Sequence, residues 1–392
     1  MRHRALALAG LCLALGAGQP AAAQGRPPVK VGMITTLSGP GSYLGEEVRD
    51  GFQLALDLKG GSLGGVPVQL VVEDDGGRPQ RGTQIADRML KSEGIKLFTG
   101  ILYSNINIAT SPEIVEAGAL FLSPNSSPSQ LAGKDCHAKY FALAWQNDNS
   151  HEAAGQTASN LGFKRAFAIV PNFQGGKDAL AGFKRYFKGE LIGEVFTRLD
   201  QTDFAAEIAQ VRAAKPDVLY QFQPGGLGIT FLRQYQQSGL QGQIPMVLSA
   251  SSIDEVTIRT VGPATEGLYV TSHWFPDFDN EASRTFVQKF TEKFGRKPTY
   301  YASQSYDVAQ AIGAGLAAAG GDVAKIEQVR SGILSTSWSS VRGPFKFGPN
   351  QHPVQDWFMG RVERGADGVL GLVTKEKVLP QRADAYAGDC KL

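Results

Sequence analysis

Hydrophobic and polar positions alternate along the chain between two kinds of segment, short continuous apolar runs and longer stretches with helical spacing. Residues 29–34 (VKVGMI) form such a run, and residues 45–58 place their apolar side chains on one helical face. Further strand patterns lie at 68–73, 95–98 and 119–122, separated by helical patterns at 78–91 and 105–118. Strands that alternate with helices of this length predict βα units, whose strands lie parallel in one sheet.

The same pattern restarts after Trp145. Strand patterns lie at 166–170, 194–198, 218–222, 245–248 and 267–271, with helical patterns at 151–161, 176–187, 204–214 and 226–237. Two such series predict an α/β protein with two doubly wound parallel-sheet lobes and right-handed crossovers.

The last third of the chain differs from the two series. Helical patterns at 280–294 and 301–319 precede residues 345–372, whose strands and Gly-Pro turns are typical of antiparallel pairing. These segments are expected to return to both lobes, so that the chain crosses a hinge several times. We therefore assign residues 24–145 and 274–345 to lobe 1, and residues 146–273 and 346–392 to lobe 2.

The N-terminus has the composition of a secretory signal. Arg2 and Arg4 precede an apolar stretch over residues 5–17, and three alanines at 21–23 form a cleavage site. The apolar stretch is too short to span a bilayer. Lipidation at Cys12 is the alternative, but Leu11 stands where lipobox cysteines normally follow Gly or Ala. We predict that residues 1–23 are removed and that the protein is exported to the periplasm.

Charge and cysteine content bear on the possible binding partners and on disulfide formation. The chain has 39 basic and 37 acidic residues, so removing Arg2 and Arg4 leaves the two numbers equal. A net charge near zero predicts no binding to nucleic acid or to anionic membranes. The remaining cysteines, Cys136 and Cys390, favour a disulfide in an oxidising compartment, with two unrelated thiols as the alternative.

Catalytic and metal-binding motifs are absent from the sequence. It contains no GxSxG and no Walker A loop, and its one dinucleotide-like string begins at Gly313 inside a helical pattern. Acidic groups at 73–75 and 277–279 are explained more simply by turns and helix caps. No histidine has metal-ligand spacing with another histidine or cysteine. We predict a protein that is not an enzyme and holds no cofactor or metal.

Small hydroxyl residues follow two neighbouring strands. Ser104 comes after the strand at 95–98, and Ser126 and Ser127 come after the strand at 119–122. In an open parallel sheet these carboxyl ends are where ligands bind, and helix N-termini there offer N–H groups to an anion. Such residues also cap helices without binding anything. Two adjacent loops of this kind favour a binding site.

Aromatic residues share the same loop positions with polar ones. A pocket with apolar walls and a few convergent polar groups is the usual form of a small-ligand site. The candidate wall residues are Tyr43, Tyr103, Trp145, Phe173, Phe222 with Gln223, and His273 with Trp274.

Several strings together resemble one family, the substrate-binding proteins of the branched-chain amino acid type of ABC transporter. They are VKVGMITTLSGPGSYLGEEVRDGFQLAL at 29–56, VVEDDGGRPQRGTQIADRML at 71–90 and YDVA at 306–309. The resemblance covers essentially the whole mature chain. It implies a type I periplasmic binding fold, in which two lobes close around a small ligand and a monomer delivers it to an inner-membrane ABC permease.

The resemblance also implies roles for individual residues. Ser104 matches the serine that binds the ligand carboxylate in the amino-acid binders, and Ser126 and Ser127 match the Ala-Thr pair that completes that site. The opposite wall, where Ser249 is a further candidate ligand contact, departs from the family, because no acidic residue stands near it to hold an α-ammonium group. An unmet ammonium in a closed cleft is costly, so an amino acid is disfavoured.

Two other strings resemble a subgroup associated with benzoate-like and phenylpropenoate-like acids. They are FQGGKDALAGFKRYFKGE at 173–190 and SHWFPDFDN at 272–280, and a cysteine near the C-terminus is a further resemblance that favours the Cys136–Cys390 bond. We expect a binding protein for a small aromatic carboxylate, with Phe173, Phe222 and Trp274 around the ligand body. The alternatives are a branched-chain amino acid or amide binder, and, from other classes, an exported hydrolase or a ligand-sensing domain.

Overall fold

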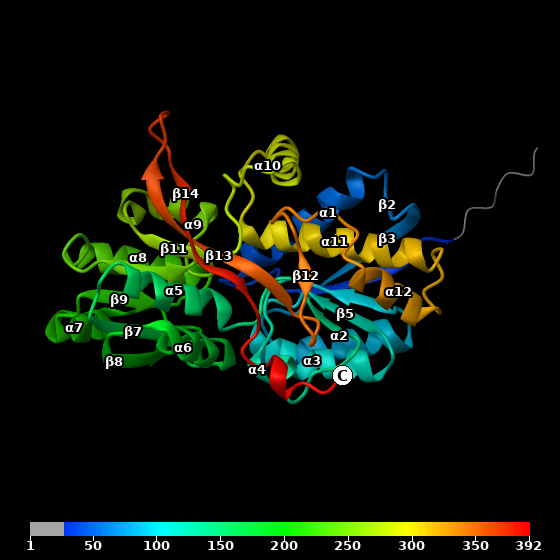
Figure 1. Cartoon of the computed structure of the whole chain (residues 1–392), viewed down its shortest axis with the longest axis horizontal. Coiled ribbons are helices and arrows are strands. Elements are labelled where there is room, and N and C mark those ends of the chain that lie inside the picture. Colours follow the sequence, from blue (N-terminus) through cyan, green and yellow to red (C-terminus); the bar gives the residue numbers. More distant parts are fainter. Residues whose placement is uncertain (1–26) are drawn as a thin grey trace, which may run out of the picture.

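The computed structural model describes residues 27–392, which form two lobes, each built on one sheet (Figure 1). The predicted signal peptide and Cys12 lie outside these residues. The first sheet has the order β2-β3-β1-β4-β5-β6, in which only the short β2 is antiparallel to its neighbour. Its strands are β1 (Val29–Thr35), β2 (Ser62–Leu63), β3 (Val66–Asp74), β4 (Leu97–Thr99), β5 (Leu120–Ser123) and β6 (Tyr140–Ala142).

Helices from two distant parts of the sequence belong to this lobe. α1 (Ser42–Asp57) packs along the later α11 (Tyr300–Ala318), and a Cβ on Gly51 would lie 2.1 Å from the carbonyl oxygen of Ala302. The two backbones therefore approach closely only because Gly51 has no side chain. Other helices of the lobe are α2 (Pro79–Lys91), α3 (Ser104–Glu116), α4 (Ser129–Ala132), α10 (Glu281–Phe294) and α12 (Ile326–Leu334). Between residues 27 and 392, no helix is long and apolar enough to cross a membrane.

The second sheet has the order β12-β13-β11-β10-β9-β7-β8, with β14 beside β13. β7 to β11 run parallel, and β13 and β14 form an antiparallel hairpin against β11. The strands are β7 (Arg165–Pro171), β8 (Glu190–Thr197), β9 (Val218–Gln221), β10 (Met246–Ser249), β11 (Tyr269–Ser272), β12 (Lys346–Phe347), β13 (Pro353–Arg364) and β14 (Leu370–Arg382). Its helices are α5 (Asn149–Asn160), α6 (Gln174–Tyr186), α7 (Ala205–Ala214), α8 (Gly226–Gln237) and α9 (Glu255–Val261).

The predicted architecture of two α/β lobes is confirmed. Continuous apolar runs identified the parallel strands because helices cover both faces of each sheet, as at β1, where the consecutive residues Met33 and Ile34 point to opposite faces and are 0% and 1% exposed. The hairpin is longer than predicted, since β14 continues to Arg382. Its exposed residues Lys375 and Lys377 interrupt the apolar pattern. The lobe boundaries stay a prediction.

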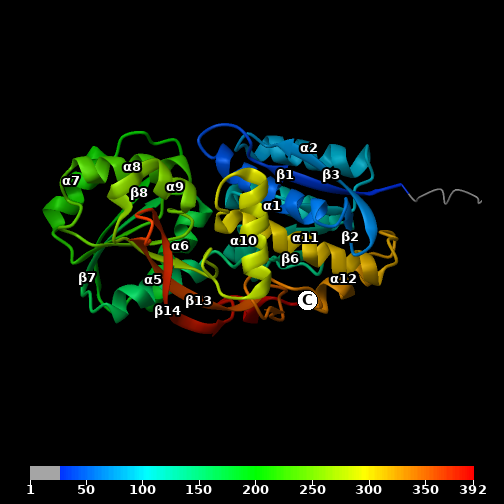
Figure 2. The same cartoon turned by 90° about the horizontal axis from the view of Figure 1, so that it is seen from above.

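The chain passes between the lobes in the segments 143–148 and 273–280, and again at the start of β13, since the preceding residues Asn350 and Gln351 still donate to carbonyls of lobe 1 (Figures 1 and 2). After β14 the C-terminal tail returns from lobe 2 to lobe 1, where Cys390 forms a disulfide with Cys136. The predicted disulfide is therefore confirmed. Along the way the Tyr386 hydroxyl donates to Asp148 (2.9 Å), and Asn350 donates to Asp384 (2.6 Å).

Candidate ligand-binding site

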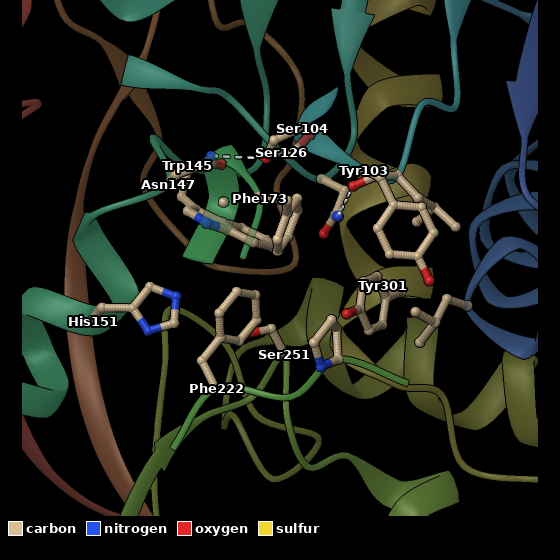
Figure 3. Close-up of a pocket in the computed structure, with 15 residues that line it drawn as sticks. Tyr103, Ser104, Ser126, Trp145, Asn147, His151, Phe173, Phe222, Ser251 and Tyr301 are labelled. Carbon is tan, nitrogen blue, oxygen red and sulfur yellow. Dashed lines mark hydrogen bonds between the residues drawn. The ribbon is translucent and has the colours of Figure 1, made fainter. Parts of the chain in front are cut away.

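A cavity lies between the two lobes, at the carboxyl ends of both parallel sheets (Figure 3). The space between its lining atoms is about 450 Å³, counting the part open to solvent. Lobe 1 and the first crossing segment contribute Leu44, Leu102, Tyr103, Ser104, Asn125, Ser126, Trp145, Asn147 and Tyr301, and lobe 2 contributes His151, Phe173, Gly175, Phe222, Pro224 and Ser251.

The start of α3 forms one polar end of the cavity. Tyr103 precedes the helix in an extended conformation, and no side chain caps its first N–H groups. Ser104, which is 2% exposed, accepts a hydrogen bond from Asn147 Nδ2 (3.0 Å) on its hydroxyl oxygen. Asn147 is itself held by the Ser127 N–H and by Asp178 (both 2.9 Å). No acceptor for the Ser104 hydroxyl proton lies among the described residues, so this proton is free for donation to a ligand.

A second helix N-terminus, from lobe 2, meets the first. α6 begins after Phe173, again without a side-chain cap. A Cβ on Gly175 would lie 3.0 Å from Ser104 Oγ and 2.6 Å from the Phe173 ring, so only glycine allows this approach. The positive ends of two helix dipoles, one from each lobe, therefore converge at the same end of the cavity.

The loop after β5 places Ser126 beside this end. Its carbonyl oxygen accepts from Ser123 Oγ (2.6 Å) and Asn107 Nδ2 (2.8 Å), which fixes the backbone of the loop. The neighbouring Asn125 donates to the Leu102 carbonyl (2.7 Å). Ser126 Oγ has one distant contact, 3.5 Å from Asn107, so its hydroxyl also remains free to donate.

Aromatic rings form the other walls of the cavity. Trp145 follows β6 at the first lobe crossing, Phe222 directly follows β9, and Tyr301 lies in the first turn of α11. The rings of Phe173 and Phe222 are 6.2 Å apart between centroids. Flat apolar walls of this kind suit a flat apolar ligand body.

No Asp, Glu, Lys or Arg side chain lines the cavity. His151 is uncharged near neutral pH, because burial lowers its pKa to about 3. Asp254, the first acidic residue after Ser251, instead caps α9 by accepting the Thr257 N–H (2.8 Å). Within residues 27–392, no group of three or more His, Cys, Asp or Glu side chains is placed to hold a metal ion. The cavity therefore presents hydrogen-bonding groups and aromatic rings, and no charged side chain that could form an ion pair with a ligand.

The structure brings some of the predicted ligand residues together and places others elsewhere. Tyr103, Ser104, Ser126, Phe173 and Phe222 all line the cavity. They come from four separate loops of two lobes.

Three predicted polar residues lie outside the cavity lining. Ser127 Oγ is 2.5 Å from His352 Nε2 and accepts from the Tyr140 hydroxyl (3.1 Å), so it points away from the ligand space. Gln223 donates to Thr197 Oγ1 (2.9 Å). The Ser249 hydroxyl pairs with that of Ser251, and only Ser251 reaches the cavity.

The remaining predicted residues serve the core or the lobe contact. Trp274 is 1% exposed and donates from Nε1 to Ser283 Oγ (2.9 Å). His273 lies behind the cavity wall, with its ring 5.6 Å from that of Trp145. Tyr43 lies at the lobe contact and does not line the cavity.

Sequence reasoning missed several lining residues. Asn147 lies two residues after Trp145 in the loop after β6, so the rule that selected serines at strand ends could also have selected it, whereas His151 lies in the first turn of α5. Tyr301 gave no such signal, because it lies in the buried helix α11 and reaches the cavity only through the packing of α11 on α1. Asn125 and Gly175 were also missed, although they lie close in sequence to the predicted residues Ser126 and Phe173.

The lobes are in contact across the cavity mouth. The Gly226 N–H of lobe 2 donates to the Pro40 carbonyl of lobe 1 (3.2 Å), and the Tyr43 hydroxyl donates to Asp254 (3.2 Å). The structure therefore has the lobes closed on the cavity.

Replacing Tyr43 with Phe is expected to weaken ligand binding by about 3- to 10-fold, because it removes a hydrogen bond present only in the closed state. Calorimetric titration measures this change. The matched control is Tyr235→Phe, which loses a hydrogen bond to Ile244 (3.1 Å) entirely within lobe 2. Equal ligand affinities for wild type and Tyr43→Phe would contradict the expectation.

Comparison with known proteins places the chain among transport proteins. Residues 28–368 match the model of a family described as periplasmic binding protein. The chain is 23% identical to Leu/Ile/Val-binding protein homolog 6 of Brucella melitensis, over 87% of this chain and 89% of that protein.

Solved structures with a similar fold include solute-binding proteins of ABC transporters. The solute-binding protein of an ABC transporter from R. palustris, in complex with benzoate, has a TM-score of 0.89 and 28% identity, over 93% of this chain and all of that one. A solute-binding protein from Rhodopseudomonas palustris BisB5, in complex with 3,4-dihydroxybenzoic acid, has a TM-score of 0.84 and 22% identity, over 91% and 99% of the two chains.

Proposed function

The chain belongs to the family of periplasmic binding proteins, and we propose that it captures a small aromatic carboxylate between its lobes for an ABC importer. Family membership implies a periplasmic location. Export by the signal at residues 1–23, a monomeric state and delivery to an inner-membrane permease are parts of the same proposal.

The observation that carries this proposal is the polarity of the cavity. At one end, two uncapped helix N-termini and the Ser104 and Ser126 hydroxyls offer hydrogen-bond donors. Neutral donors at helix N-termini stabilise a carboxylate without a buried counter-ion. The remaining wall consists largely of the rings of Trp145, Phe173 and Phe222.

The same polarity disfavours an amino acid as the ligand. An α-ammonium group buried in a closed cavity needs an anionic or strongly polar partner, because desolvating an unpaired charge is costly. Asp254 is engaged with Tyr43 and with the first turn of α9, and it does not line the cavity. A carboxylate on an apolar ring leaves no charge unmet.

Closure follows from contacts with both lobes. The donors at the carboxylate end include α3 of lobe 1 and α6 of lobe 2, and Phe222 of lobe 2 faces Trp145 of the crossing segment. A ligand that touches both lobes binds the closed state better and shifts the population toward it. The benzoate held by the R. palustris relative supports a ligand of this class.

A thermal-shift panel on ligand-free protein tests the proposal. Benzoate and its derivatives are expected to stabilise the protein by about 2.7 kcal/mol at a ligand concentration 100 times Kd. Benzamide, which has the ring without the carboxylate, is the matched control and should give a much smaller shift. Stabilisation by leucine or valine, with none by any aromatic acid, would overturn the ligand class.

A further inference from the structure

His151 presents a polar atom to the cavity that the carboxylate site does not use. It lies in the first turn of α5, is 3% exposed and lines the cavity beside Phe222, with the two rings 4.9 Å apart. Figure 3 shows its ring across the cavity from Ser104 and Ser126, directed toward Trp145 and Phe222. If the ligand carboxylate lies at Ser104, the opposite edge of the ligand ring lies at this end of the cavity.

Only one nitrogen of His151 has a partner in the described part of the chain. Nδ1 lies 2.8 Å from the hydroxyl oxygen of Tyr220, which is also 3.2 Å from the Ala179 carbonyl. These contacts fix the imidazole on its Nδ1 side, away from the cavity. Nε2 is left without a protein partner among residues 27–392, at the edge of a cavity whose adjoining wall is aromatic.

Whether Nε2 donates or accepts a hydrogen bond depends on where the Tyr220 hydroxyl directs its single proton. If this proton goes to Ala179, Nδ1 carries the imidazole proton and Nε2 is an acceptor. If it goes to Nδ1, Nε2 carries a proton and is a donor. A phenolic hydroxyl satisfies either form, because it both donates and accepts. A methoxy oxygen can only accept, so it pairs with Nε2 only when Nε2 carries the proton. A hydrogen or fluorine substituent leaves the nitrogen essentially unpaired.

We propose that Nε2 of His151 hydrogen-bonds a hydroxyl group on the ring of the ligand, which makes hydroxylated aromatic acids the preferred class. This inference rests on the proposed function, since it requires the carboxylate to lie at the Ser104 end. Burial supports it, because a neutral imidazole selects a neutral hydroxyl over a second carboxylate.

Calorimetric titrations of wild type and His151→Phe with benzoate, 3-hydroxybenzoate, 4-hydroxybenzoate and 4-methoxybenzoate test the inference. In wild type, at least one hydroxybenzoate is expected to bind about 3- to 10-fold more tightly than benzoate, as for one neutral hydrogen bond. The readout is the ratio of the two affinities within each protein. In His151→Phe this ratio should fall to about 1, whereas His137→Phe, on a partly exposed histidine outside the cavity lining, should keep the wild-type ratio.

The outcomes separate the two proposals. Binding of benzoate with no advantage for either hydroxybenzoate, or an advantage that survives in His151→Phe, overturns the role of His151 and leaves the aromatic-acid function standing. Binding of no aromatic acid overturns both. If His151→Phe does not fold, the ¹⁵N shift of His151 Nε2 in wild type decides the matter: it should move with the preferred hydroxybenzoate and stay in place with benzoate, and equal shifts for both ligands count against the inference.

Discussion

Replacing Ser104 with Asp should lower the affinity for an aromatic carboxylate by at least about 100-fold, since like charges brought together in a buried site cost several kcal/mol. Position 104 is the first residue of α3, where an acidic side chain is favourable for the helix itself. The Asp side chain keeps an acceptor for Asn147 Nδ2 but removes the free hydroxyl proton and adds a negative charge. Binding is therefore lost through repulsion of the ligand, which calorimetric titration measures.

Two further variants isolate the effect of this charge. Ala205→Asp places the same residue at the first position of α7, exposed and outside the cavity lining, and should leave affinity unchanged. Ser104→Ala removes only the donor and should cost about 1–3 kcal/mol of binding free energy. Circular dichroism and the Tm show whether Ser104→Asp is folded. A folded Ser104→Asp protein that binds within threefold of wild type would place the carboxylate elsewhere.

Loss of the Cys136–Cys390 disulfide should lower the free energy of unfolding by about 2–5 kcal/mol. The two cysteines are separated by 254 positions, so the bond closes a very long loop of the unfolded chain. In the chain-entropy model the stabilisation grows with the length of that loop. Urea denaturation of a Cys136→Ser, Cys390→Ser protein measures the difference.

Dithiothreitol provides the internal control for this measurement. It should lower the stability of wild type to that of the double variant and leave the double variant unchanged. The hydrogen bonds of Tyr386 and Asp384 remain in both proteins and hold the tail near its native position. Equal unfolding free energies for oxidised wild type and the double variant would show that the disulfide does not stabilise the fold.

Much of the fold could be predicted from the sequence because the physical signals are local. A parallel strand covered by helices on both faces reads as a continuous apolar run, and the run at 29–34 corresponds to β1. Helix packing over long sequence distances has no such signal. The pairing of α1 with α11 depends on Gly51, whose need for close approach appears only when both helices are in place.

The sequence predicted which loops form the site, but not which residue of each loop faces the cavity. Ser126 and Ser127 are adjacent in an irregular loop and face different surroundings, with Ser126 in the cavity wall and Ser127 against His352 and Tyr140. A sequence shows that both carry hydroxyls but not which one faces the ligand. The same limit applies to Trp274, an aromatic residue in a loop whose ring is buried in the core against Phe286.

The residues missed by sequence reasoning act at the junction of the lobes. Asn147 connects Ser104 of lobe 1 to Asp178 of lobe 2, and His151 lies in the first turn of α5, the first helix of lobe 2. Their position at the cavity depends on how the two lobes meet, which no local sequence pattern shows. In a protein that binds by closing, such junction residues couple ligand contact to lobe position.

The proposed function requires the carboxylate of an aromatic acid to lie at the helix N-termini and its ring to lie between the aromatic walls. A crystal structure of the complex with 4-hydroxybenzoate tests it most directly. We expect a carboxylate oxygen at about 2.6–3.0 Å from Ser104 Oγ, and the ring between Trp145 and Phe222. A ligand with its carboxylate at His151, or bound outside the interlobe cavity, would contradict it.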